Sequence, residues 1–182
     1  MLIGGSDIET TGLKTGDHRI IEVYHAVWDF HKRVKVDSFH ELIDPQRSIP
    51  ADSTRIHNLT AADLAGKRTW DDVAPEFLKS LNSVEQVVFH NGQGFDGPFI
   101  DYELKRIGLP PSNMSIIDTF LLGRWATPDG KAPSLKELCR ACEVDYQPSE
   151  AHRADYDTDK MMSCFFKAVD WGFIDVGTDI AA

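Results

Sequence analysis

The stretch S-D-I-E-T-T-G-L at residues 6–13 places two carboxylates, Asp7 and Glu9, on either side of a single isoleucine. Residues 2–8 are predicted to form the first strand, and side chains two positions apart leave the same face of a strand. Two like charges this close repel each other unless a cation lies between them, and hard oxygen ligands of this kind suit Mg²⁺ or Mn²⁺. The stretch therefore predicts a strand that ends in a metal site.

Two later stretches supply the rest of an acidic site. H-N-G-Q-G-F-D at residues 90–96 ends in Asp96, and H-R-A-D-Y-D at residues 152–157 places His152 five positions before Asp157. Four carboxylates are enough for two divalent ions, an arrangement that supports in-line attack on a phosphodiester. A histidine nearby can act as the general base that takes a proton from the attacking water. These residues predict a metal-dependent nuclease.

Simpler explanations compete with some of these assignments. Asp96 precedes Gly97-Pro98 and could cap a helix, and His152 could be an ordinary surface histidine. Asp155 is the alternative to Asp157, although its spacing from His152 is three rather than five. Asp118 is predicted to be a structural residue at a strand end. The remaining histidines other than His90 have no carboxylate at ligand spacing and are predicted to be structural or solvated: His18, His25, His31, His40 and His57.

The composition is that of one globular domain. The chain has 182 residues, of which 42% are hydrophobic and 26% charged, and this length allows a core without disulfide or metal support. No apolar run approaches the roughly 18 residues that cross a bilayer. The net charge of −10 predicts modest binding to nucleic acid rather than a tight clamp on duplex DNA. Solvated charge is the predicted role of four cations that could touch phosphates, namely Arg124, Lys131, Arg140 and Arg153.

The cysteines predict no zinc or redox site. Cys139 and Cys142 form a C-x-x-C inside an amphipathic helical pattern, no second C-x-x-C follows, and Cys164 makes the total odd. We therefore expect buried thiols and, from the reducing environment that they indicate, a cytoplasmic protein.

Hydrophobic periodicity predicts an alternation of strands and helices. Residues 2–8, 19–30 and 33–43 are predicted to form an antiparallel meander, and residues 84–89 and 116–118 two further strands. Capping patterns predict helices that start at Thr60, Thr69 and Ser134. Residues 97–107 and 154–171 are predicted as helices, and the prolines at 45 and 50 as marks of a loop.

The order of these motifs resembles the DEDDh 3′→5′ exonucleases of the DnaQ-like superfamily. The matching stretches are D-x-E-T-T-G at 7–12, R-I-I-E-V at 19–23, I-P-A-D-S-T-R-I-H-N-L-T at 49–60, D-D-V-A-P-E-F-L at 71–78, H-N…F-D at 90–96, I-D-T at 117–119, S-L-K-E-L-C at 134–139 and H-R-A-x-x-D at 152–157. The resemblance implies an α/β fold: a ribonuclease H-like mixed five-stranded sheet flanked by helices on both faces. A single exonuclease domain is expected over residues 1–172, and residues 173–182 are expected to form a loose C-terminal tail.

The resemblance also implies a role for each site residue. Asp7, Glu9 and Asp157 would hold the metal that activates water, Asp96 would support a second ion, and His152 would be the base. Substrate binding would fall to Thr10, Leu13, His90 and Asn91. The two ions would be Mg²⁺ or Mn²⁺.

The expected reaction is release of 5′-mononucleotides from the 3′ end of single-stranded DNA, which is favoured over RNA. Alternatives are trimming of short RNA, as in oligoribonuclease-like relatives, and a nucleic-acid-binding module with little turnover. We expect a stand-alone enzyme of a bacterium or phage without an obligate protein partner. The sequence leaves open whether the protein forms a homodimer.

Three features depart from the family pattern. Gly4-Gly5-Ser6 replaces the usual apolar run before the first motif, which predicts a weaker strand and a looser Asp7. The stretch from His90 to Asp96 is one residue longer than in proofreading subunits, which indicates a subtype. Tyr24-His25 replaces small residues after R-I-I-E, which predicts crowding in the sheet.

Overall fold

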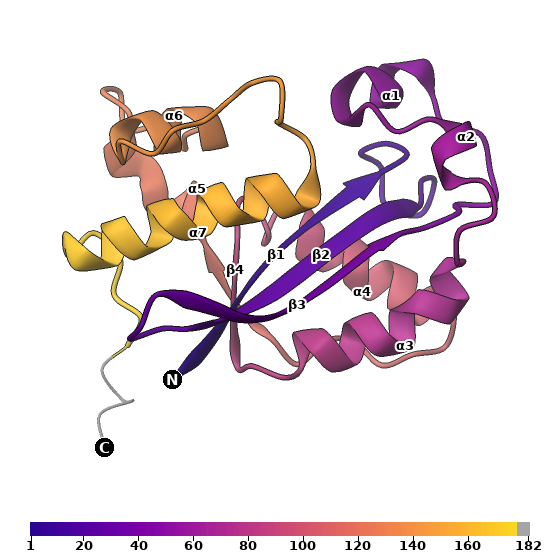
Figure 1. Ribbon diagram of the computed structural model, residues 1–182, viewed down its shortest axis with the longest axis horizontal. Coiled ribbons are helices and arrows are strands. Elements are labelled where there is room, and N and C mark those ends of the chain that lie inside the picture. The colour runs from indigo at the N-terminus through magenta and orange to yellow at the C-terminus, as the bar shows by residue number, and fades with distance from the viewer. Residues whose placement is uncertain (178–182) are drawn as a thin grey trace.

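Five strands form one mixed sheet in the order β3-β2-β1-β4-β5 (Figure 1). The computed structural model describes residues 1–177. The strands β1 (Leu2–Thr10), β2 (Ile20–Asp29) and β3 (Val34–Leu42) form the predicted antiparallel meander. The two short strands β4 (Gln86–Phe89) and β5 (Ser115–Asp118) run parallel to β1. The mixed five-stranded sheet predicted from the sequence is therefore confirmed.

Helices cover both faces of this sheet, as predicted (Figure 1). On one face lie α3 (Trp70–Leu81) and α4 (Asp96–Arg106), and on the other lies α7 (Ala154–Asp170), against which α6 (Leu135–Ala141) packs. Shorter helices complete the connections: α1 (Ala51–His57), α2 (Ala61–Leu64), α5 (Thr119–Leu122) and the 3₁₀ turn η1 (Gly123–Ala126). Among the described residues, no helix is long and apolar enough to span a membrane.

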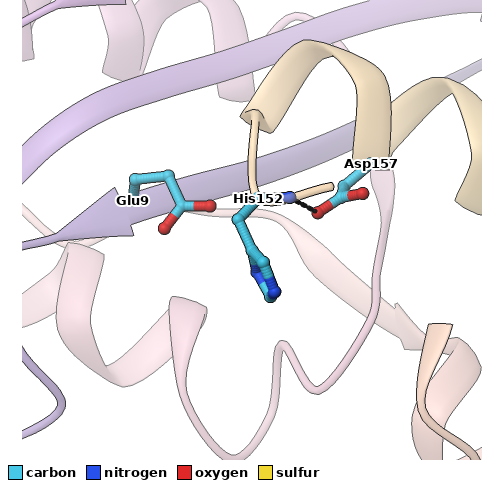
Figure 2. Close-up of side chains that lie close together, drawn as sticks. All are labelled: Glu9, His152 and Asp157. Carbon is cyan, nitrogen blue, oxygen red and sulfur yellow. Dashed lines mark hydrogen bonds between the residues drawn. The ribbon is translucent and has the colours of Figure 1, made fainter. Parts of the chain in front are cut away.

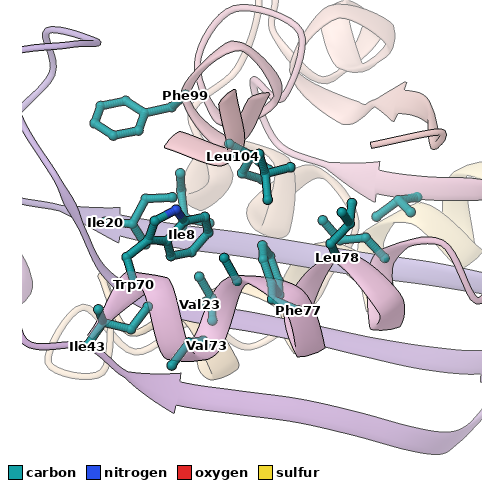
Figure 3. Packing of buried hydrophobic residues seen from close by; sticks show 14 of the residues in the cluster. Ile8, Ile20, Val23, Ile43, Trp70, Val73, Phe77, Leu78, Phe99 and Leu104 are labelled. Atoms are coloured by element: carbon teal, nitrogen blue, oxygen red, sulfur yellow. The ribbon is translucent and has the colours of Figure 1, made fainter. Parts of the chain in front are cut away.

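The helical periodicity of α3 creates the first core layer. Trp70, Val73 and Phe77 are buried on one side of this helix, together with Leu78 and Leu81, and they pack on β2 and α4 (Figure 3). The Trp70 indole N–H donates to the Glu103 carbonyl at 2.9 Å, so its polar atom is satisfied inside the layer. This packing fixes α4, and with it Asp96 at the helix start, against the sheet.

The second core layer lies under α7. Met162 and Phe165 of this helix are buried with Ile3 of β1 and Val88 of β4. Since α7 starts beside the end of β1, its packing brings the first turn of the helix, which carries Asp157, to the edge of the sheet where the first motif ends (Figure 1).

The glycines of β1 leave the space that this packing needs. A Cβ at Gly5 would lie 2.7 Å from Met162 Sδ and 3.0 Å from the Trp28 ring, and a Cβ at Gly4 would lie 2.5 Å from His25 Cε1. The glycines therefore leave room for α7 and for the His25 side chain. The predicted crowding by Tyr24-His25 is wrong for the same reason: the bulk of His25 occupies the space that Gly4 leaves.

His25 is fully buried, and neither of its ring nitrogens has a hydrogen-bond partner among the described residues. Burial lowers the pKa of His25 from 6.5 to about 4. As the pH falls, the unfolded chain therefore takes up a proton at His25 before the folded protein does. The contribution of neutral His25 to the free energy of unfolding is complete above pH 6.5 and is lost as the pH falls toward 4.

We expect His25→Leu to remove this loss. Between pH 8 and pH 4.5 the free energy of unfolding of the wild type should fall by about 2–3 kcal/mol more than that of the variant, measured by urea denaturation. His31→Leu, at an exposed histidine in the β2–β3 turn, is the control and should follow the wild type. Identical pH dependence in His25→Leu and the wild type would contradict the assignment.

The loop marked by Pro45 and Pro50 is confirmed. The helix α1, which the sequence analysis did not predict, starts directly after Pro50 and is followed by Asn58 in a left-handed conformation with φ 59°. Part of the predicted loose tail is packed, since Ile174 is buried in the second core layer and Phe173 stacks on Trp125 with ring centroids 4.3 Å apart. Residues 178–182 of that tail lie outside the described residues. The three cysteines are buried free thiols, as predicted.

Candidate active site

The end of β1 carries the two carboxylates of the first motif. Burial raises the pKa of Asp7 well above its usual range, and the charges of Asp96, Glu9 and Asp157 raise it further. The pKa of Glu9 is raised in the same way, first by burial and then by Glu22, which lies directly opposite Glu9 in the β1–β2 ladder. Each carboxylate is therefore destabilised as an anion by its neighbours, which is the electrostatic state that a bound cation relieves.

Asp96 enters the site from the first turn of α4. Its side chain is buried, and burial raises its pKa to about 7. Its Oδ1 atom has no hydrogen-bond partner within residues 1–177. A buried carboxylate oxygen without a partner is costly unless another group satisfies it. Asp96 is the first residue inside α4, and the N-cap position is taken by Phe95, so Asp96 is not the N-cap of this helix.

Asp157 lies in the first turn of α7, and His152 lies just before this helix. Glu9, His152 and Asp157 each offer one potential ligand atom, and these three atoms lie within 4.8 Å of one another (Figure 2). Asp157 Oδ2 accepts the backbone N–H of His152 at 2.9 Å, and this bond holds His152 in a left-handed conformation with φ 62°. The competing residue, Asp155, instead pairs with Arg153 at 2.9 Å. The structure thus brings Asp157, and not Asp155, to Glu9.

A cavity of about 350 Å³ contains all of these groups. Its lining includes every residue that the sequence places in the site: Asp7, Glu9, Thr10, Leu13, His90, Asn91, Asp96, His152 and Asp157. None of the four cations considered for phosphate contact lines it. The fold therefore brings residues that lie far apart in the chain together in one site.

The four predicted substrate-binding residues differ in what they can offer. Leu13 is 80% exposed on the loop after β1, whereas Thr10 is buried and its hydroxyl donates to the Gly12 carbonyl at 2.9 Å. Both ring nitrogens of His90 lie 3.0 Å from protein oxygens, so its ring surface is the part left for a ligand. Asn91 lines the cavity with φ 75°, and its N–H donates to Asp118, which confirms the structural reading of Asp118.

Sequence reasoning missed one wall of the cavity. Ser53, Ile56 and His57 come from α1, and Phe95 precedes α4. The Ser53 hydroxyl donates to the Thr11 carbonyl at 2.8 Å, which ties α1 to the loop of the first motif. A signal was present: Asp52 near the start of α1 and Arg55 and His57 at its end match the charge preferences of helix termini.

The donor set fits divalent cations. Oxygen ligands from four carboxylates, one of them with an unsatisfied buried oxygen, match the preferences of Mg²⁺ and Mn²⁺. A mixed sheet with helices on both faces and a carboxylate cluster at the end of its central strand defines the class of ribonuclease H-like nucleases.

Comparison with known proteins identifies the family to which this chain belongs. A family model described as an exonuclease, RNase_T, matches residues 5–165. The chain belongs to this exonuclease family, and its resemblance to the DnaQ-like DEDDh exonucleases is confirmed.

Among its relatives, the DNA polymerase III subunit epsilon of Pasteurella multocida is 32% identical over 161 residues, covering 84% of this chain and 62% of that protein. The chain thus spans less than two thirds of the length of this relative. A solved structure of exonuclease X in complex with 5′ overhanging duplex DNA is 27% identical, with a TM-score of 0.70, and covers 95% of this chain and 94% of that one. E. coli exonuclease I in complex with a dT13 oligonucleotide shares the fold, with a TM-score of 0.78 at 15% identity over 92% of this chain and 40% of that one.

Proposed function

We propose that the protein is a metal-dependent 3′→5′ exonuclease that releases 5′-mononucleotides from single-stranded DNA by a two-metal mechanism. The observation that carries this proposal is the unsatisfied Asp96 Oδ1 beside carboxylates that raise one another's pKa. The structure of exonuclease X in complex with 5′ overhanging duplex DNA supports DNA as the class of substrate.

Each residue of the site has a role in this proposal. Asp7, Glu9, Asp96 and Asp157 would hold the cations, which supply an acidified water and neutralise charge on the phosphate. His152 takes the proton of the attacking water as its oxygen bonds to phosphorus. The bond from phosphorus to the 3′ oxygen of the preceding nucleotide breaks, and a 5′-mononucleotide leaves.

The terminal nucleotide would lie between the two apolar walls of the cavity. Leu13 projects from the loop after β1, and Ile56, which is half exposed, projects from α1. Contact with apolar side chains tolerates any base, which suits an enzyme that removes nucleotides without regard to sequence.

The test is a gel time course on matched 5′-labelled single-stranded DNA and RNA oligonucleotides. With Mg²⁺ or Mn²⁺ we expect a ladder that shortens from the 3′ end, faster on DNA, and with EDTA we expect no shortening. A faster RNA ladder would favour the RNA-trimming alternative. Intact oligonucleotides in every lane would contradict the proposal and favour a binding module without turnover.

A further inference from the structure

We propose that Tyr146 is a positioning residue that orients the Asp157 carboxylate for cation binding. This inference rests on the proposed function. Tyr146 lies in the segment between α6 and α7, and its hydroxyl donates to Asp157 Oδ1 at 3.3 Å. It belongs to none of the motifs that mark the family, and it does not line the cavity.

The two oxygens of Asp157 have separate donors. Oδ1 accepts from the Tyr146 hydroxyl, and Oδ2 accepts from the His152 backbone N–H. Two donors on opposite oxygens define the plane of the carboxylate. Outer donors of this kind orient metal-binding side chains, and their loss typically weakens metal binding or activity by about 10–100-fold.

Tyr146 is itself held in place. Its ring packs against the buried group formed by Leu138, Cys139, Cys142 and Cys164, which joins α6 to α7. It also meets the ring of Tyr156 at a centroid distance of 5.7 Å. The hydroxyl is thus aimed at Asp157 by packing that does not depend on the hydrogen bond, and removal of the hydroxyl alone leaves this packing intact.

Tyr156 offers a matched control. It too is partly buried at the start of α7, and its hydroxyl accepts the Gln147 backbone N–H at 2.6 Å without contacting Asp157. Tyr146→Phe and Tyr156→Phe each remove one hydroxyl from the same loop–helix junction. Only the first removes a donor to the proposed ligand.

The experiment measures Mn²⁺ binding to the metal-free full chain by titration calorimetry, together with the Tm of each variant. We expect Tyr146→Phe to bind Mn²⁺ about 10–100-fold more weakly, and Tyr156→Phe to bind it as the wild type does. The Mg²⁺ concentration for half-maximal nuclease activity should rise in parallel, and excess Mg²⁺ should restore the rate of Tyr146→Phe.

Two results would overturn the inference. Unchanged Mn²⁺ affinity in Tyr146→Phe, with or without a lower Tm, would show that the hydroxyl only anchors the loop. Equal weakening in both variants would show a general effect of loosening the junction. A wild type that binds no Mn²⁺ would instead overturn the proposed function itself, so the two failures are distinguishable.

Discussion

Replacement of Asp7 by asparagine is expected to lower the rate of nucleotide release by about three orders of magnitude or more. Asp7 is the carboxylate on which the charges of Asp96, Glu9 and Asp157 all act, so it lies at the electrostatic centre of the site. Cations that stabilise charge in a phosphoryl transition state are worth several kcal/mol, and each 1.36 kcal/mol corresponds to about tenfold in rate. Single-turnover rates on a 5′-labelled oligonucleotide in Mg²⁺ measure the effect.

The same substitution should stabilise the metal-free protein. Because the pKa of Asp7 is raised in the folded state, the folded protein holds this proton more tightly than the unfolded chain does. Stability is therefore lost as the pH rises from the usual value of 3.8 through the raised folded value. Asparagine has no such ionisation, so in EDTA at pH 8 the variant should have the higher Tm. The difference should shrink as the pH approaches 4.

Asp155→Asn is the matched control for the rate. It removes one carboxylate from the first turn of α7, where Asp155 pairs with Arg153 rather than with the acidic site. We expect it to keep the wild-type rate within a few fold. Wild-type activity in Asp7→Asn, or an equal loss in Asp155→Asn, would show that the metal site is assigned to the wrong carboxylates.

Much of the fold follows from local patterns. The apolar residues on both faces of β2 predict a central strand, and the structure buries both faces. The spacing of Trp70, Val73 and Phe77 on α3 predicts burial on one face of a helix, which the structure also confirms. The carboxylates were also visible, because the D-x-E spacing is a property of a single strand. Their convergence with Asp96 and Asp157 came from the family resemblance, since no local rule connects positions so far apart in the chain.

Two other features were missed at the level of sequence. Glycine in a strand has a local cost, but the fit of Gly5 against Met162 and of Gly4 against His25 depends on contacts between distant elements. The wall formed by Ser53, Ile56 and His57 was missed because α1 is seven residues long and follows two prolines, so the charges at its ends were its main local signal. Short helices of this kind depend on tertiary contacts, such as that of Ser53 with Thr11, more than on propensity.

Removal of the His152 side chain is expected to have the second large effect on the rate of nucleotide release. His152→Ala should lower the single-turnover rate by about 10²–10⁴-fold, the range typical of a lost general base. The side chain is exposed at the mouth of the site, and its backbone is held by Asp157, so alanine should leave the fold intact. The exposed His31, far from the cavity lining, provides the control variant His31→Ala, which should keep the wild-type rate.

Metal binding separates the two chemical roles that the position of His152 permits. One ring nitrogen of His152 lies within 4.8 Å of a carboxylate oxygen of Glu9 and of Asp157, so this side chain could bind a cation directly rather than accept a proton. A base makes no contribution to the affinity for Mn²⁺, whereas a ligand does. Slow turnover of His152→Ala with unchanged Mn²⁺ affinity in calorimetry therefore supports the base. Slow turnover with weakened affinity would assign His152 to the metal, and undiminished turnover would remove it from the mechanism.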